Sequence, residues 1–424
     1  MPTSALSTWQ PLLDGELRTR ALSVADQIAT ELKARGADLV NDGSLASGHA
    51  GLAFAMAYLD QALPGRGYGD AATLHLDGAM DYLAEYPLHA DLYGGFTGIA
   101  WAASQIERLA GRHDAQGDEF AEIDDVLVTM LSAPAWDLHY DLISGLVGVG
   151  VYALERLPHP RAHECLTRVV EHLDRWSERL PDGVTWHTPV HVLPSARRVE
   201  RPNGEYNLGL AHGAPGPIAL LAQASAVGAA ADVASRLVDQ AVPWLLAQRR
   251  DYCPGASYGH EVCPEDDQGP SRSAWCYGDC GIAAALLGAA RSRGNAEWER
   301  AAIELAVAAG NRPEPDMSVY DACMCHGWGG LAHLFNRLYQ TSGDPRLAEP
   351  ARRFCERTID IQHPGRGIAG YANWQGGFDQ PWGWKTEAGF LEGAAGVALA
   401  LAAAATDVTP TWDSVLLISN TVES

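Results

Sequence analysis

The sequence predicts an all-α chain built from seven helix pairs that closes on itself. Three observations favour this fold class. A short glycine pattern recurs seven times, the run after each copy is apolar all round, and an amphipathic segment precedes each copy. A helix that is apolar on every side is buried, whereas an amphipathic helix has one face toward solvent. The expected architecture is therefore an inner set of helices covered by an outer set.

The inner helices follow the recurring pattern, which is Gly-x-x-Gly and then about ten small or aliphatic residues. Paired glycines at a helix start allow turn conformations and close approach of neighbouring backbone. We expect these turns to pack the inner helices tightly against one another. The first glycines of the seven copies are Gly48, Gly95, Gly145, Gly213, Gly278, Gly327 and Gly393.

The outer helices are the segments whose apolar residues recur at helical spacing opposite a charged face. They are Leu17 to Ala34, Ala71 to Glu85, Glu119 to Leu131, Arg161 to Leu180, Ala231 to Arg249, Glu297 to Ala309 and Arg346 to Ile361. A repeat of this kind either extends as an open solenoid or closes. Neither end shows the polar capping repeat that an open solenoid needs, so we expect closure, with the first helix packed against the last.

Three of the intervals between copies are longer than the others. One holds alternating Val, Thr and Trp residues between turn residues, which indicates a small β insertion near residues 182–207. The next long interval reads as a loop. The last is Gly-rich and carries Tyr371, Trp374, Phe378, Trp382 and Trp384, which could stack on a peptide or cover one end of the core. We assign residues 1–424 to a single domain.

The composition excludes some classes of function. The chain has 30 Lys and Arg against 53 Asp and Glu, a net charge of −23, which argues against a nucleic-acid partner. It has no apolar run long enough to span a bilayer and no secretory signal at its N-terminus. We therefore expect a cytoplasmic protein without a membrane span. In that reducing compartment, clustered cysteines indicate metal ligands or catalytic groups more than disulfides.

The candidate site comes from the register of the repeats. Because every inner helix begins at the same relative position, the residues just before the first glycines should converge. Cys276 and Cys325 lie two residues before their glycines, and His326 and His212 lie one before theirs. Thiolate and imidazole are the ligands that Zn²⁺ prefers.

Spacing alone leaves three readings open at this point. Cys276, Cys325 and His326 could form a three-ligand catalytic zinc site with one open position. Cys280 or Cys323 could complete a closed structural site, although Cys280 has the register of a helix interior. The thiols could also pack without metal. Cys253 and Cys263, each followed by Pro, could form a separate pair or lie in a surface loop.

Several segments resemble the lanthionine synthetase C family, the cyclases of lanthipeptide biosynthesis. The similar segments are YDLISGLVGVG, NLGLAHGAPGPIALL, WCYGDCGIA, CHGWGGLAHL, GFLEGAAGVALAL and PTWDSVLLIS. The resemblance implies an α/α toroid, a double ring of about seven inner and seven outer helices. It also implies one Zn²⁺ per chain, held by the positions of Cys276, Cys325 and His326. Asp141, His212, Arg272 and Tyr277 would line the site.

The activity that this resemblance implies is addition of a peptide cysteine thiol to dehydroalanine or dehydrobutyrine. We expect His212 to act as acid or base, with a hydrogen-bonded core histidine as the alternative. Asp141 could orient His212 or only cap a helix start. Arg272 could stabilise an enolate oxygen or pair with an acidic loop residue, and the role of Tyr277 as a hydrogen-bond donor rests on the resemblance. His49 and His139 lie in similar turns, where packing or solvation is expected.

Two other classes of protein are alternatives to the cyclase. A toroidal glycosidase or terpenoid cyclase would need paired carboxylates or an Asp-rich motif, and none stands out. A zinc-containing relative that binds glutathione or another thiol without cyclase activity is the alternative function. For the cyclase, the expected partners are a dehydrated precursor peptide as substrate, a separate dehydratase and perhaps an exporter. A location peripheral to the membrane, within a biosynthetic assembly, is compatible with these partners.

Overall fold

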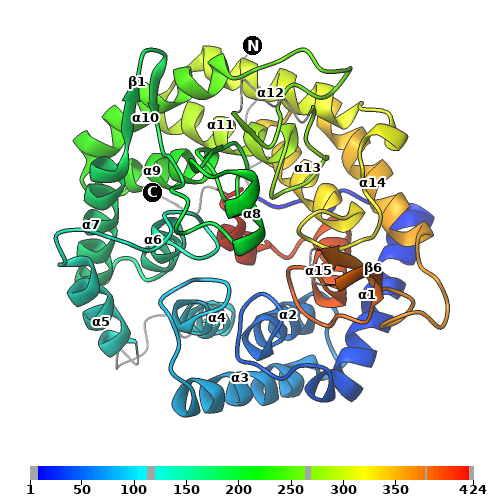
Figure 1. Ribbon diagram of the computed structural model, residues 1–424. Coiled ribbons are helices and arrows are strands. Elements are labelled where there is room, and N and C mark those ends of the chain that lie inside the picture. Colours follow the sequence, from blue (N-terminus) through cyan, green and yellow to red (C-terminus); the bar gives the residue numbers. More distant parts are fainter. Residues whose placement is uncertain (1–7, 112–119, 263–268, 378–379, 420–424) are drawn as a thin grey trace. The chain divides into compact units, whose positions relative to one another are not determined.

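The computed structural model describes residues 8–111, 120–262, 269–377 and 380–419 (Figure 1). The chain divides into two compact units. The first comprises Met1–His89, Tyr93–Ala115 and Glu314–Trp412, and the second comprises Ala90–Leu92, Gln116–Pro313 and Asp413–Ser424. Each unit is described by itself.

The first unit contains seven α-helices and one β-hairpin in its described part. The helices are α1 (Gly15–Arg35), α2 (His49–Ala62), α3 (Tyr68–Glu85), α4 (Phe96–Leu109), α13 (Trp328–Ser342), α14 (Ala348–Asp360) and α15 (Ala394–Ala405). Short 3-10 turns η1 (Gly36–Asp38), η2 (Glu314–Asp316) and η3 (Pro345–Leu347) lie between them. A further 3-10 turn, η4 (Thr411–Leu416), follows α15 along the chain and is shared by the two units. Strands β5 (Asn373–Gly377) and β6 (Gln380–Lys385) pair antiparallel.

The second unit contains eight α-helices and two small sheets in its described part. The helices are α5 (Ala121–Leu131), α6 (Leu146–Glu155), α7 (Pro160–Trp176), α8 (Ser195–Glu200), α9 (Pro215–Ala226), α10 (Ala231–Ala247), α11 (Asp279–Arg293) and α12 (Ala296–Gly310). Strand β1 (Glu178–Leu180) pairs with β2 (Gly183–Thr185), and β3 (Tyr206–Asn207) pairs with β4 (Glu261–Val262), both antiparallel.

The seven expected inner helices are confirmed as α2, α4, α6, α9, α11, α13 and α15. All twelve residues of α15 are buried, and α2 and α11 are buried over most of their length. The expected outer helices are α1, α3, α5, α7, α10, α12 and α14, and α7 and α14 each bury a single apolar stripe. The hydrophobic pattern along the chain therefore separates buried from covering helices correctly.

The first helix packs against the last, as expected for a closed repeat. Within the first unit, α1 lies against α15, and the backbone N–H groups of Leu12 and Leu13 both donate to the carbonyl of Ala404. The indole of Trp9 donates to the carbonyl of Ala403 at 2.8 Å. The chain segment before α1 therefore satisfies carbonyls at the C-terminal end of α15, which lack intrahelical partners.

The β structure differs from the expectation in three places. The expected helix from Arg161 to Leu180 ends at Trp176, because Gly183, at φ +140°, turns the chain so that residues 178–180 become β1. The β insertion near 182–207 contains β2, β3 and also the helix α8, but the partner strands β1 and β4 lie outside that range. The segment expected to be a tryptophan-rich loop forms the β5–β6 hairpin.

Among the described helices, none combines the length and apolar character needed to cross a membrane.

Candidate functional site

Each buried helix is entered through a tight turn of the same construction, here called an opening turn. In six of these turns the N–H at the start of the helix donates to the carbonyl seven residues earlier, at 2.9–3.2 Å. The donor and acceptor residues are His49 and Asp42, Phe96 and His89, Leu146 and His139, Ala214 and Asn207, Trp328 and Asp321, and Ala394 and Glu387. The chain therefore enters these helices in one register.

The second glycine of the pattern has a steric reason. A Cβ atom at Gly281 would collide with the carbonyl of Trp275, and one at Gly330 would collide with the carbonyl of Met324. The same approach, to the carbonyl six residues earlier, occurs at Gly51, Gly148, Gly216 and Gly396. The repeated glycines therefore let the turn fold back onto the first turn of its helix.

Backbone hydrogen bonds join neighbouring opening turns close to the residue two before the first glycine; only Leu142 among the residues below lies three before its glycine. In the first unit Cys325 donates to Leu391 at 2.8 Å, Leu391 to Ala46 at 2.9 Å, and Ala46 to Tyr93 at 3.0 Å. In the second unit Leu142 donates to the carbonyl of Ala211, and Ala211 to that of Cys276, at 3.1 and 3.3 Å. This ladder fixes where the residues beside each glycine lie, Cys276 and Cys325 among them.

In the second unit the structure brings His212 and Asp141 together. His212 Nδ1 lies 2.7 Å from Asp141 Oδ2, and the other carboxylate oxygen accepts the backbone N–H of Ser144 at 2.8 Å. Asp141 is 2% exposed, whereas the His212 side chain is 38% exposed. Because Nδ1 donates to the buried carboxylate, Nε2 is the nitrogen that can exchange a proton with a ligand.

The electrostatics of this pair favour two opposite charges. Burial alone would lower the pKa of His212, but the hydrogen bond and charge of Asp141 outweigh burial and raise it. Burial would raise the pKa of Asp141, yet His212 and His139 hold it below its ordinary value. His212 is therefore suited to hold and release a proton near neutral pH.

Tyr277 lies beside His212, with ring centroids 5.9 Å apart. Its hydroxyl oxygen accepts a hydrogen bond from Asn207 Nδ2 at 3.0 Å. The centroid of the His260 ring lies 5.1 Å from that of Tyr277. Burial raises the pKa of Tyr277, so the hydroxyl keeps its proton over the physiological pH range.

Asn207 and His260 were not singled out from the sequence. Asn207 begins an opening turn, six residues before its glycine, so the register could have indicated it. His260 is placed by the pairing of β3 with β4, where Leu208 donates to the carbonyl of His260 at 2.8 Å. No local sequence pattern predicts the pairing of β3 with β4.

Arg272 also begins an opening turn of the second unit. Its positive charge, together with burial, lowers the pKa of His260. Within the residues that the structure describes, Arg272 forms no ion pair, and it is partly exposed. The acidic residues of the preceding loop lie within 263–268, outside the described residues, so the alternative that Arg272 pairs with one of them stays a prediction.

The first unit carries Cys325 and His326 in the turn that opens α13. Cys325 is buried and His326 is half-buried. Within this unit, potential metal-binding atoms of Asp321, Cys323 and His326 lie within 4.8 Å of one another. The potential metal-binding atoms of Asp321 and Cys323 already accept hydrogen bonds from the backbone. Asp321 accepts the N–H groups of Cys323 and Trp374, both at 3.0 Å, and Cys323 Sγ accepts the N–H of His326 at 3.5 Å.

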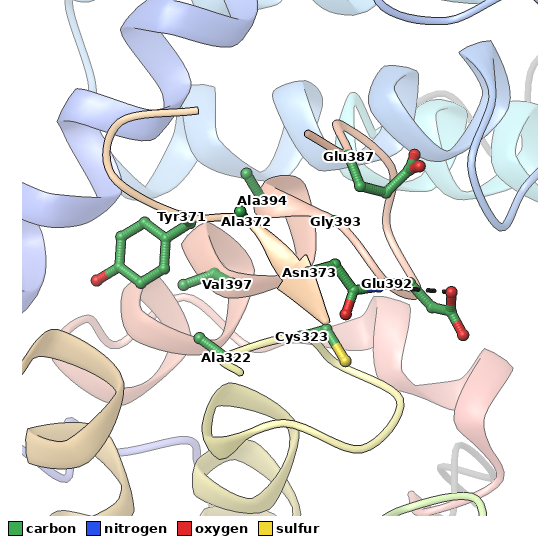
Figure 2. A pocket seen from close by; sticks show the side chains of 10 residues that line it. All are labelled: Ala322, Cys323, Tyr371, Ala372, Asn373, Glu387, Glu392, Gly393, Ala394 and Val397. Atoms are coloured by element: carbon green, nitrogen blue, oxygen red, sulfur yellow. Dashed lines mark hydrogen bonds between the residues drawn. The ribbon is translucent and has the colours of Figure 1, made fainter. Parts of the chain in front are cut away.

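Cys323 lines a narrow pocket together with Asn373, Glu387 and Glu392 (Figure 2). Burial raises the pKa of the Cys323 thiol well above its ordinary value, and the neighbouring carboxylates of Asp321 and Glu392 add to this effect. The Sγ atom of Cys323 already has a contact within the turn, since it accepts the N–H of His326.

The remaining thiols of interest are separated by their surroundings. Cys280 lies inside α11, and burial raises the pKa of its thiol to about 12. Cys253 forms part of an isolated bridge with Ala256. Its suggested partner Cys263 lies outside the described residues.

The two additional histidines have structural partners. His49 and His75 share a hydrogen bond of 3.0 Å between their Nδ1 atoms. His139 Nδ1 accepts the backbone N–H of Asp141 at 3.0 Å, and its ring packs on Tyr140. His139 therefore helps to shape the turn that presents Asp141.

The aromatic residues of the third long interval divide into two groups. Tyr371 belongs to the core, where its hydroxyl donates to the carbonyl of Thr358 at 2.9 Å. On the β5–β6 hairpin Trp374 packs against both Trp382 and Trp384, which are 56% and 42% exposed. Phe378 lies outside the described residues.

These features define a class of protein: a chain of paired helices whose opening turns carry thiols, imidazoles and a buried carboxylate. The sequence profile of the lanthionine synthetase C-like protein family matches residues 40–417, so the chain belongs to this family. A search of curated protein sequences gives no match.

Among solved structures, the chain is similar to a nisin cyclase, with a TM-score of 0.72 and 18% sequence identity. The match covers 93% of this chain and 97% of the nisin cyclase chain. It confirms the fold class, which is the α/α toroid.

Proposed function

We propose that the chain is a zinc-dependent lanthipeptide cyclase. It would join cysteine thiols of a dehydrated peptide to dehydroalanine or dehydrobutyrine, giving lanthionine or methyllanthionine rings. Family membership supports this proposal, and the observation that carries it is the hydrogen-bonded pair of His212 and Asp141. Asp141 and His212 both belong to opening turns, as do Cys276 and Cys325.

The residues that would hold zinc are Cys276, Cys325 and His326. Two thiolates and one imidazole suit Zn²⁺, and three protein ligands leave a fourth position open. Asp321 and Cys323 are less suited, since their donor atoms accept backbone N–H groups. When bound, zinc would lower the pKa of a substrate thiol and hold its sulfur in place.

His212 would act as the general base and acid that transfers the proton. Its Nε2 can take the proton of the attacking thiol and later return it to the α-carbon of the former dehydro residue. The C–S bond forms at the β-carbon, the π electrons of the alkene move toward the carbonyl oxygen, and protonation of the α-carbon completes the addition. Asp141 holds the ring of His212 in place and stabilises its cationic form.

Arg272 and Tyr277 would act on the other end of the reacting group. The enolate that forms during the addition carries negative charge on its oxygen, which hydrogen-bond donors and cations stabilise. Tyr277 retains its proton and lies beside His212, and Arg272 brings a positive charge to the same region of the second unit.

The proposal implies partners. A dehydratase must supply the dehydrated peptide, and an exporter would remove the cyclised product. We propose a cytoplasmic location, with any membrane association depending on such an assembly.

The proposal is tested by counting free thiols. The chain is incubated with the dehydrated peptide encoded beside its gene, and thiols are alkylated and counted by mass spectrometry against a control without enzyme. We expect thiols to disappear without a change in peptide mass. An unchanged thiol count would contradict the cyclase proposal.

Metal analysis of two variants separates the roles within the site. We expect Cys276→Ala to lose zinc, whereas His212→Ala keeps zinc and fold but loses ring formation by roughly 100-fold or more. Wild-type protein that binds zinc and thiols without forming rings would instead support the thiol-binding alternative.

A further inference from the structure

The hydroxyl of Tyr277 is hydrogen-bonded to Asn207, which is hydrogen-bonded in turn to Glu205. These two residues have no role in the reaction proposed above, and the three side chains together are called the relay below. We propose that Asn207 and Glu205 are positioning residues that aim the hydroxyl proton of Tyr277 at the enolate oxygen of the substrate. This inference rests on the proposed cyclase function. It concerns how the second unit orients one donor, and all the groups involved belong to that unit.

The orientation of the Asn207 amide is fixed by its neighbours. Its Oδ1 accepts the backbone N–H of Gly209 at 2.8 Å, and its Nδ2 donates to Glu205 Oε1 at 2.8 Å. A flipped amide would place its oxygen against the Glu205 carboxylate and its NH₂ group against the N–H of Gly209. Both alternatives are repulsive, so Nδ2 faces Glu205 and Tyr277.

The Tyr277 oxygen is therefore an acceptor on the side of Asn207. One Nδ2 proton goes to Glu205 and the other goes to the Tyr277 oxygen at 3.0 Å. Both Nδ2 protons of Asn207 are thus donated, and its Oδ1 accepts the N–H of Gly209, so Asn207 does not accept the phenolic proton, which must point elsewhere. Among the described residues, the rings of His212 and His260 are neighbours of the Tyr277 ring.

Gly209 makes room for this arrangement. A Cβ atom at Gly209 would lie 2.7 Å from Cδ1 and Cε1 of Tyr277. The same residue donates the backbone N–H that orients Asn207. One glycine therefore sets both the ring position and the amide orientation.

The side chain of Glu205 is 5% exposed and has a cationic partner. Its Oε2 accepts a hydrogen bond of 2.6 Å from the Nη2 atom of Arg197, which lies on α8. Arg197 also contacts Glu261 of β4 at 3.2 Å. A charge-assisted hydrogen bond of this kind is short and directional, so Arg197 holds Glu205 in place as the acceptor for Asn207.

The chemical consequence is a preorganised donor. When the thiolate sulfur bonds to the β-carbon, the electron pair of the alkene moves to the carbonyl oxygen, and the Tyr277 hydroxyl donates a hydrogen bond there without losing its proton. The α-carbon receives its proton from His212. A donor that is already aimed needs no reorganisation as charge develops.

The test compares Tyr277→Phe, Asn207→Ala and the double variant, with Tyr206→Phe as the matched control. Tyr206 is the strand neighbour of Asn207, and its hydroxyl donates to Glu178 at 2.8 Å, away from the proposed relay. We expect kcat for thiol consumption to fall about 100-fold in Tyr277→Phe. We expect a fall of about 10-fold in Asn207→Ala, with KM and zinc content unchanged, and a change of less than about twofold in Tyr206→Phe.

The double variant decides whether Asn207 acts through Tyr277. If it does, the double variant is no slower than Tyr277→Phe, because the two substitutions remove one interaction. Multiplied losses, or a loss of zinc or of melting temperature in both Asn207→Ala and the isosteric Asn207→Asp, would overturn the proposal.

A second readout does not depend on activity. In protein with ¹³C-labelled tyrosine, the Cζ resonance of Tyr277, assigned from its absence in Tyr277→Phe, should move in Asn207→Ala and stay in place in Tyr206→Phe. An unmoved resonance would overturn the relay. Wild-type protein that leaves the thiol count unchanged would contradict the cyclase function instead, and the resonance would still decide whether Asn207 orients Tyr277.

Discussion

At the scale of single residues, the difference between His212 and Asp141 in burial is what makes the pair useful. Asp141 is enclosed and held by Ser144, whereas His212 remains partly open on its Nε2 side. The raised pKa of His212 and the lowered pKa of Asp141 mean that the pair stabilises the fold. This contribution is fully present between the ordinary values of 3.8 for aspartate and 6.5 for histidine. It is lost as pH rises through the pKa of His212 in the fold, or falls through that of Asp141.

Asp141→Asn should shift the pH dependence of ring formation. Without the carboxylate charge, burial dominates and the pKa of His212 falls, so the limb of the pH–rate profile that reports His212 should move to lower pH. The rate at the optimum should fall roughly 100-fold. The profile is measured by thiol alkylation from pH 5 to about 9, with zinc content as the control. An unshifted limb would show that His212 does not carry the titration.

Cys280→Ala and Cys325→Ala should behave differently although both thiols are buried. Cys280 packs inside α11, so its loss should cost about 1 kcal/mol of stability and leave zinc content and rate within about twofold. Cys325→Ala should abolish stoichiometric zinc. Metal analysis of the two purified variants checks this, and loss of zinc in Cys280→Ala would argue for a closed four-ligand site.

At the scale of elements, the register of the repeats was enough to single out the candidate residues that lie beside the glycines. It gave no information about residues in the long intervals between repeats. His212, Cys325 and His326 could be singled out because each lies one or two residues before a glycine of a visible repeat. Glu205 and His260 could not, since the pairing of β3 with β4 joins segments more than fifty residues apart and only two residues long. The helix expected to reach Leu180 is shorter for a local reason: the amphipathic spacing continues beyond Trp176 into residues 178–180, which pair as β1 with the strand that begins at Gly183.

Gly281→Ala tests the opening turn as an element. The added Cβ would collide with the carbonyl of Trp275, which belongs to the backbone and cannot move without disturbing the turn that presents Cys276 and Tyr277. We expect a loss of more than about 2 kcal/mol in the free energy of unfolding, measured with urea. Gly383→Ala is the matched control: nothing lies within 4 Å of the new atom, and the change should stay within about 0.5 kcal/mol.

At the scale of the whole molecule, the pattern of buried and amphipathic helices was sufficient to predict the fold class, and the lack of polar capping repeats was sufficient to predict closure. The contact of α1 with α15 is not encoded locally. It depends on Trp9, whose indole reaches the carbonyl of Ala403 and whose ring lies under the guanidinium of Arg337 at 4.5 Å. An isolated aromatic residue before a helix carries no signal of a partner almost four hundred residues away.

Trp9→Ala should therefore destabilise the chain far more than its place near the N-terminus suggests. Removal of a buried indole should cost about 3 to 5 kcal/mol, measured by denaturant unfolding. Trp382→Ala, on the exposed hairpin, should change stability by less than about 1 kcal/mol. Equal effects would show that the segment before α1 does not close the repeat.

The ladder between opening turns uses only main-chain atoms, and this makes it indifferent to the side chains that it carries. Leu391 and Ala46 occupy rungs of the same kind as Cys325, with the same backbone bonds. Substitutions at these positions should therefore preserve the backbone hydrogen bonds of the turns. Ala46→Cys or Leu391→His would add a thiol or an imidazole beside the existing turn. Within each unit, the opening turns therefore offer positions at which new chemical groups can be introduced one residue at a time.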